Sequence, residues 1–197
     1  MNNFAEKIDQ SIVLLINGWN TPVLDETMWI VSSKIIWIPL YVYLIYLASK
    51  KLNYKQTILF TIVAIMSVVF SDLISHHCFK EVFQRFRPSH NLLLINKLHF
   101  YKTSPGEFYQ GGLYGFVSSH AANFFAIALF TGLALKEYYP RILTKLLIIA
   151  SFVSFSRIYL GVHYLSDIVV GAIVGSLISY ILYRFVYLDL KERYNIK

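Results

Sequence analysis

The densest group of chemically active side chains lies in the stretch SRIYLGVHYLSD, residues 156–167. It places Arg157, His163 and Asp167 between two apolar segments. His163 and Asp167 are one helical turn apart, which would put the carboxylate within reach of the imidazole. A carboxylate that accepts a hydrogen bond from Nδ1–H fixes the tautomer and leaves Nε2 with a free lone pair. The stretch therefore predicts a histidine that acts as a nucleophile or a base.

Two other stretches carry side chains suited to the same chemistry. KEVFQRFRP contains Lys80 and Arg87, and VSSH contains Ser118, Ser119 and His120. Arginine offers paired donors to a phosphate and lysine offers a point charge. The first N–H groups of a helix starting at the serines would point at the same oxygens. With His120 placed to protonate a departing oxygen, these groups predict phosphoryl transfer.

Each group also has a purely structural interpretation. Arg85 and its basic neighbours could lie at the membrane interface and extend to lipid headgroups. The two serines could cap the helix that follows them. His120 could be an interfacial histidine, and Arg157 and Asp167 could form an ion pair between two helices.

Composition places the chain among membrane proteins. Of its 197 residues, 56% are hydrophobic and 15% are charged, and the mean hydropathy is +0.53. A soluble domain usually carries about 25% charged residues. An arginine or aspartate near the centre of a membrane helix costs at least ~2.5 kcal/mol, so a cluster of ionisable groups there indicates a functional site. Cys78 is the single cysteine, which excludes a disulfide within the chain.

Five apolar runs are long enough, or nearly so, to cross a bilayer. The expected spans are residues 28–49, 57–75, 121–135, 142–160 and 168–183. Residues 4–19 differ, because their apolar side chains recur at helical spacing and Lys7, Asp9 and Gln10 lie elsewhere on the helical wheel. That pattern predicts an amphipathic helix on the membrane surface, with a sixth span as the alternative. The predicted fold class is an all-α polytopic membrane helix bundle of one domain, residues 1–197, with five transmembrane helices and an N-terminal interfacial helix over residues 1–20.

The basic residues of the connections predict the orientation. They are Lys50, Lys51, Lys55, Lys136, Arg141, Lys145, Arg184, Lys191, Arg193 and Lys197. With five spans they all lie on one side, which the positive-inside rule makes cytoplasmic. We therefore expect a multi-pass protein of the plasma (inner) membrane whose active site faces the periplasmic side. Because topology accounts for the net charge of +7, no nucleic-acid partner is expected.

The connection over residues 89–117 is expected on the outer face with the reactive groups. Its length is typical of a functional loop rather than of a linker. Lys97 and Lys102 could bind additional anionic groups of a substrate, which would make this connection the source of selectivity. The alternative is an interfacial cover without selectivity.

The order and spacing of the three stretches resemble the motifs of the type 2 phosphatidic acid phosphatases. That family has lysine, six residues and Arg-Pro, then Pro-Ser-Gly-His, then Ser-Arg, five residues, His, three residues and Asp. The matching residues are Lys80, Arg87, Pro88, Ser118, His120, Ser156, Arg157, His163 and Asp167. Val117 and Ser119 depart from the pattern by replacing its proline and glycine. Ser119 therefore either turns its hydroxyl aside or adds a hydrogen bond to the phosphate pocket.

The resemblance implies a role for each residue. His163 would be the nucleophile that forms a phosphohistidine, Asp167 would orient it, and His120 would be the general acid. The residues implied to bind phosphate are Lys80, Arg87, Arg157, Ser118 and Ser119. No metal or cofactor is required, and the partners are the bilayer and a lipid phosphate substrate.

The substrate implied by the resemblance is undecaprenyl pyrophosphate, phosphatidylglycerol phosphate, phosphatidic acid or a lipid A phosphate. The motifs recognise only the phosphate, so they do not choose among these lipids. Two other functions are weighed against the lipid phosphatase. One is an enzyme like the vanadate-dependent haloperoxidases, which share the pocket but are typically soluble. The other is a membrane transporter or scaffold without catalysis, which the filled catalytic positions disfavour.

Overall fold

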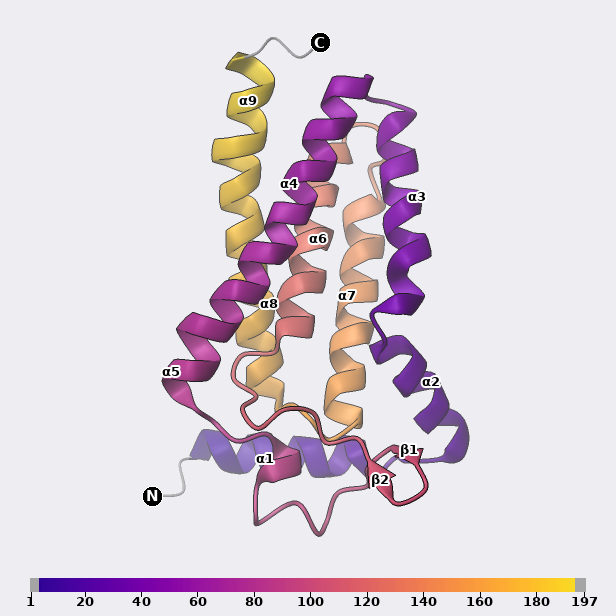
Figure 1. Cartoon of the computed structure of the whole chain (residues 1–197), viewed down its shortest axis with the longest axis vertical. Helices are drawn as coiled ribbons and strands as arrows, with labels where there is room; N and C mark the ends of the chain where they lie inside the picture. The colour runs from indigo at the N-terminus through magenta and orange to yellow at the C-terminus, as the bar shows by residue number, and fades with distance from the viewer. Residues whose placement is uncertain (1–3, 194–197) are drawn as a thin grey trace.

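Long helices make up most of the structure and run side by side (Figure 1). The computed structural model describes residues 4–193. Its helices are α1 (Phe4–Asn17), α2 (Pro22–Ser32), α3 (Ile38–Ser49), α4 (Tyr54–Leu73), α5 (Glu81–Phe83), α6 (Ser119–Leu135), α7 (Ile142–Tyr159), α8 (Leu165–Leu182) and α9 (Leu188–Arg193). Two π-helical turns, Ile74–Lys80 and Tyr183–Tyr187, continue α4 and α8. Strands β1 (Lys102–Ser104) and β2 (Glu107–Phe108) form a small antiparallel hairpin.

Several of these helices are able to span a membrane. Three are long and apolar enough by themselves: Tyr54–Phe83, Ile142–Tyr159 and Leu165–Glu192. Helices α2 and α3 meet the requirements for a membrane span only when they are taken together as one bent segment. Helix α6 is apolar but shorter than these spans. The prediction of an all-α polytopic membrane bundle is confirmed at this level, with three or four helices able to span.

The first apolar run differs from the single helix expected over residues 28–49. It is two helices, α2 and the segment that ends with α3, bent by 67° at the junction. Ser33 ends α2 in an extended conformation, and Pro39 in the first turn of α3 has no N–H to continue the ladder. The break leaves Ser32 and Lys34 at the depth where the reactive residues of the other helices lie.

Helix α6 lies at the centre of the bundle and packs against α4, α7 and α8. Buried aromatic and aliphatic side chains fill this core, among them Phe60, Phe130 and Val153. The outward face of α4 is also apolar, since Ile58, Ile62, Ile65 and Val69 are exposed. An apolar exterior over a packed interior is expected of a helix bundle that sits in lipid.

Two glycines allow α8 to approach α6 at backbone distance. A Cβ added at Gly175 would lie 1.9 Å from the carbonyl oxygen of Ala122, and one at Gly171 would lie 2.6 Å from that of Ser118. Small residues four apart are a common device for close helix packing in membranes. Here they bring the first turn of α8, which carries Asp167, beside the first turn of α6.

Helix α1 crosses the end of the bundle near the start of α8 (Figure 1). Asp9, Val13 and Asn17 form its buried face. The Asn17 Nδ2 donates to the carbonyl oxygens of Tyr159 and His99, both at 2.8 Å. The opposite face is apolar and exposed, and its large residues are Phe4, Ile8 and Leu15.

The close contact between α6 and α8 leads to a stability prediction. Gly175→Ala should destabilise the protein by about 2 kcal/mol, because the new methyl group meets backbone that has no side chain to rotate away. Thermal unfolding of the purified protein in detergent measures this as a lower midpoint. Gly112→Ala is the matched control, because a Cβ there would have no atom within 4 Å. Equal midpoints for the two variants would contradict the proposed packing.

Candidate active site

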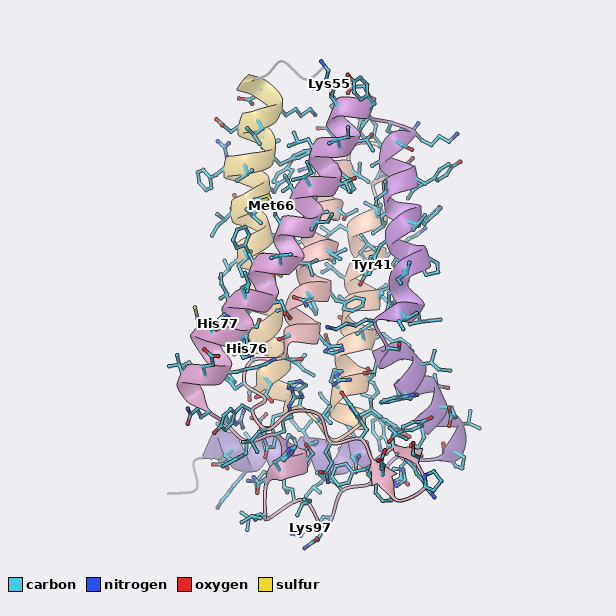
Figure 2. The ribbon with its side chains drawn as sticks, viewed as in Figure 1. Tyr41, Lys55, Met66, His76, His77 and Lys97 are labelled. Carbon is cyan, nitrogen blue, oxygen red and sulfur yellow. The ribbon has the colours of Figure 1, made fainter. Side chains whose placement is uncertain are left out.

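The three reactive stretches meet in one cavity of about 190 Å³ at the end of the bundle where α1 lies. Its lining residues are Lys34, Asp72, His76, Lys80, Arg87, Tyr109, Gly111, Gly112, Ser119, His120, Asn123, Arg157 and His163. Four of these side chains are cationic and one is a carboxylate, so the cavity suits an anion. Figure 2 shows Lys55 at the opposite end of the molecule.

A tight turn after α7 presents His163 to this cavity. Gly161 adopts a left-handed φ of 67°, a conformation that favours glycine. The backbone N–H groups of Val162 and His163 both donate to the Arg157 carbonyl oxygen, at 3.1 and 3.2 Å. The turn fixes the imidazole in place, and His163 is only 1% exposed.

The two ring nitrogens of His163 face different partners. Nδ1 lies 3.3 Å from Asp167 Oδ2, and Nε2 lies 2.8 Å from Arg87 Nη1. A guanidinium only donates hydrogen bonds, so Nε2 must be the acceptor and the proton must be on Nδ1. This is the tautomer expected from the sequence, and the unprotonated Nε2 accepts from Arg87.

Burial and neighbouring cations keep the His163 ring neutral. Burial lowers the pKa of His163 well below its ordinary value, and Arg87 and then Arg157 lower it further. Both effects penalise the imidazolium form. The Nε2 lone pair is therefore available at neutral pH.

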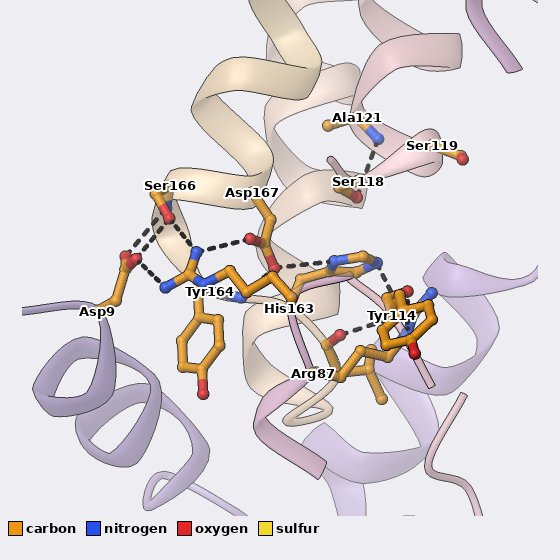
Figure 3. Close-up of polar contacts among 12 residues, drawn as sticks. Asp9, Arg87, Tyr114, Ser118, Ser119, Ala121, His163, Tyr164, Ser166 and Asp167 are labelled. Carbon is orange, nitrogen blue, oxygen red and sulfur yellow. Dashed lines mark hydrogen bonds and ion pairs between the residues drawn. The ribbon is translucent and has the colours of Figure 1, made fainter. Parts of the chain in front are cut away.

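Asp167 is fully buried in the first turn of α8 (Figure 3). Besides the His163 ring, its Oδ2 accepts from the backbone N–H of Tyr164 at 3.0 Å, so it also caps the helix. Its Oδ1 pairs with Arg85 Nη1 at 2.9 Å. The alternative of an ion pair between Arg157 and Asp167 is wrong, because Arg85 occupies that position. Arg85 points inward to this carboxylate rather than outward to headgroups.

Arg87 lies directly against the His163 ring. Its Nε donates to the Tyr114 carbonyl oxygen at 3.2 Å, and its Nη1 donates to that of Val162 at 3.1 Å. Burial, and next the charge of Arg157, lower the pKa of Arg87 to about 10. The guanidinium therefore stays charged at neutral pH in contact with Nε2.

Arg157 lies on the α2 side of the cavity. Its Nη1 donates to the Ser32 hydroxyl, and its Nη2 donates to the Tyr109 hydroxyl at 2.7 Å. Its Nε is buried and has no hydrogen-bond partner in the described part of the chain. Arg157 is thus held rigidly by neutral hydroxyls while keeping its charge for an anion.

The π-helical turn after α4 carries Lys80 toward α6, as such turns often do at functional sites. Lys80 Nζ donates to the Ser119 hydroxyl at 2.7 Å. Ser119, which replaces the family's glycine, therefore contributes a hydrogen bond at the cavity. Ser118 is buried and caps α6 by accepting from the Ala121 N–H at 3.5 Å. Its predicted contact with phosphate stays a prediction.

The sequence motifs did not identify Lys34 or Tyr109 as cavity residues. Lys34 reaches the cavity because of the break between α2 and α3, which no local pattern marked. Tyr109 comes from the connection over residues 89–117, and it also packs edge-on against Trp29. Lys97 and Lys102, the residues expected to bind further anionic groups, do not line this cavity. Figure 2 shows Lys97 at the outer end of the molecule.

An apolar groove of about 370 Å³ opens from the same place between α3, α4 and α6. Its apolar lining includes Leu44, Ile45, Phe60, Ala64, Ile65, Val68, Val69, Phe124 and Ile127. The groove and the polar cavity share Lys34, His120 and Asn123. A polar site for an anion therefore lies next to an apolar groove along the helices, with these three residues at their common boundary.

The apolar helices and the cationic cavity indicate an integral-membrane protein with a site for an anionic group. The sequence matches the PAP2 superfamily over residues 57–191, and the chain belongs to that family. The PAP2 match agrees with the resemblance found in the motifs. The roles of the individual residues remain predictions.

Two relatives carry the same description. A lipid A 4'-phosphatase of Porphyromonas gingivalis is 32% identical over 95% of this chain and 76% of its own length. A lipid A 4'-phosphatase of Bacteroides thetaiotaomicron is 30% identical over 93% of this chain and 79% of its own length. These relatives confirm the predicted class of enzyme, a membrane lipid phosphatase.

Two crystal structures share the fold. A transmembrane PAP2-type phosphatidylglycerolphosphate phosphatase from Bacillus subtilis matches 97% of this chain and 88% of its own, with a TM-score of 0.66 and 20% identity. Aquifex aeolicus LpxE matches 87% of this chain and 92% of its own, with a TM-score of 0.58 and 21% identity. At these identities the likeness establishes the architecture only.

The environment of His163 leads to a prediction about its protonation. An ordinary histidine has a pKa near 6.5. Because burial and the adjacent cations lower the pKa of His163, the ring should stay neutral at pH 6, with its proton on Nδ1. Nitrogen NMR of histidine-labelled protein in micelles measures this, and the spectrum of His163→Ala identifies the resonance. Titration of His163 near pH 6.5 would contradict the assigned environment.

Proposed function

We propose that this protein hydrolyses a phosphate monoester of a lipid A-type substrate, with His163 as nucleophile and without a metal. The substrate class is supported by the two relatives described as lipid A 4'-phosphatases. The observation that carries the proposal is the position of the cationic cavity beside the apolar groove, with Lys34 and His120 lining both. A molecule with a phosphate joined to acyl chains fits both parts at once.

The first step transfers the phosphoryl group to the protein. The Nε2 lone pair of His163 attacks phosphorus, and the bond to the lipid oxygen breaks. The anionic phosphate beside His120 favours the protonated form of this ring, which gives that oxygen its proton, so the lipid leaves as an alcohol. Arg87, Arg157 and Lys80 neutralise the charge on the phosphoryl oxygens. Arg87 must then exchange its contact with Nε2 for a phosphate oxygen.

The second step returns the enzyme to its starting state. Water attacks the phosphohistidine, and the bond between phosphorus and Nε2 breaks. His120, now neutral, takes the proton of that water and is ready for another cycle. Inorganic phosphate is the second product. Asp167 holds the Nδ1 proton throughout and stabilises the charged ring of the intermediate.

The position of the groove accounts for lipid access. It opens among α3, α4 and α6, and α3 and α4 carry exposed apolar side chains such as Val42 and Ile65. Acyl chains could enter from the bilayer while the phosphate enters the cavity. Lys34 lies where the two meet and is placed to contact polar groups next to the scissile bond.

The membrane arrangement completes the proposal. We place α1 on the membrane surface, with its exposed apolar face toward lipid and five spans above it. The short helix α6 and the bent pair α2–α3 count among these spans. Lys55 and the other basic connections lie at the far end of the bundle, which the positive-inside rule makes cytoplasmic (Figure 2). The active site then faces the periplasmic side of the plasma (inner) membrane.

Phosphate release from a panel of lipid phosphates tests this function. Purified protein should release inorganic phosphate from lipid A in the presence of a chelator, faster than from phosphatidic acid, phosphatidylglycerol phosphate or undecaprenyl pyrophosphate. His163→Ala should abolish release because no other residue replaces Nε2. His77→Ala is the matched control, since this exposed histidine lies outside the cavity lining.

Two outcomes of that assay would contradict different parts of the proposal. Preference for another lipid in the panel would refute the substrate and leave the chemistry standing. Loss of activity on chelation, or normal activity of His163→Ala, would refute the mechanism itself.

A further inference from the structure

The orienting carboxylate Asp167 is one end of a longer chain of charges. Arg85 Nη1 pairs with Asp167 Oδ1 at 2.9 Å, and its Nη2 pairs with Asp9 Oδ2 at 2.8 Å. One planar guanidinium therefore joins a carboxylate of α8 to a carboxylate of α1. Figure 3 shows Asp9 on one side of this chain and His163 on the other.

Ser166 closes the chain into a compact unit. Its hydroxyl accepts from Arg85 Nη1 at 2.6 Å and donates to Asp9, and its backbone N–H donates to Asp9 Oδ1 at 3.0 Å. The Arg85 guanidinium also stacks 4.2 Å from the centre of the Tyr164 ring. Arg85 is therefore fixed by contacts on several sides, with little freedom to rotate.

Burial makes this arrangement unlike an ordinary surface ion pair. Asp9 is only 6% exposed and Asp167 is fully buried, while the Arg85 side chain is 28% exposed. A carboxylate removed from water needs both a counter-charge and hydrogen bonds. Arg85 and Ser166 meet this requirement for Asp9, which explains how a carboxylate can lie on the buried face of α1.

The sum of the charges matters for the histidine. Arg85 alone would neutralise Asp167 and draw its electron density away from His163 Nδ1–H. Asp9 supplies a second negative charge, so the three groups together carry one net negative charge beside the ring. This net negative charge stabilises the positively charged ring of the phosphohistidine, which a neutral pair of Arg85 and Asp167 would not do.

We propose that Arg85 and Asp9 are positioning residues of the phosphatase: Arg85 fixes the Asp167 carboxylate against His163, and Asp9 of α1 keeps Arg85 in place and balances its charge. This inference rests on the proposed roles of His163 and Asp167. It makes α1 a part of the catalytic machinery rather than only a membrane contact.

A double-mutant cycle tests the chain. Asp9→Asn should lower kcat about tenfold, because Arg85 loses one of its anchors and orients Asp167 and His163 less well. Arg85→Gln should lower kcat about a hundredfold, because that orientation is lost entirely. KM should stay within about twofold in both, because neither residue lines the phosphate cavity. The double variant should be no slower than Arg85→Gln, since Asp9 acts only through Arg85.

Two control variants separate positioning from other effects. Glu6→Gln removes one carboxylate from the exposed side of α1, where its partner is Gln10, and should keep normal kcat. Asn17→Ala loosens the other anchor of α1 without touching the charges, so it should lower the thermal midpoint while kcat stays within about threefold. Melting curves and size-exclusion profiles show whether each variant is folded.

The possible results point to different conclusions. Multiplying losses, about a thousandfold in the double variant, would overturn the coupling of Asp9 to Arg85. An equal fall of kcat in Asn17→Ala would overturn positioning by charge and reduce Asp9 to an anchor of α1. Normal kcat in Asp9→Asn with no activity in His163→Ala would refute this inference and leave the proposed function intact. Activity in His163→Ala would instead refute the function.

Discussion

The contact between Asp167 and His163 is the interaction on which the rest of the site depends. A buried carboxylate next to apolar helices is unfavourable unless both of its oxygens have partners. Asp167 meets that condition through the His163 ring, the Tyr164 N–H and Arg85. Because the imidazole is one of those partners, its tautomer is fixed by the requirement that stabilises the carboxylate. Stability and reactivity therefore rest on the same hydrogen bond.

The architecture serves this contact by bringing distant segments to one end of the bundle. The close approach of α8 to α6 at Gly175 sets the first turns of both helices side by side. The segment around Arg87 pairs with the one around Tyr114 and holds the guanidinium over Nε2. In the proposed function the apolar groove selects the substrate, because a phosphate attached to apolar chains contacts both surfaces.

The sequence predicted which residues meet in the cavity, but it did not predict the contacts that hold them there. His163 and Asp167 do contact each other, although His163 precedes α8 and Asp167 reaches back as a cap instead of lying one turn along a shared helix. Local spacing could not reveal Asp9, because its partners lie more than 70 residues away. Lys34 was missed because Pro39 marks a helix start but does not by itself predict a bend of 67° that brings Lys34 to the cavity.

The central claim is that His163 is a nucleophile, and trapping the phosphorylated enzyme tests it most directly. Brief exposure to a phosphorus-labelled lipid, followed by alkaline denaturation, should leave label on the protein that acid removes and alkali does not. Peptide mapping should place the label on His163, and His163→Ala should carry none. A wild-type protein that turns over substrate with inversion of configuration at phosphorus and never carries label would contradict the account, because water would then attack directly.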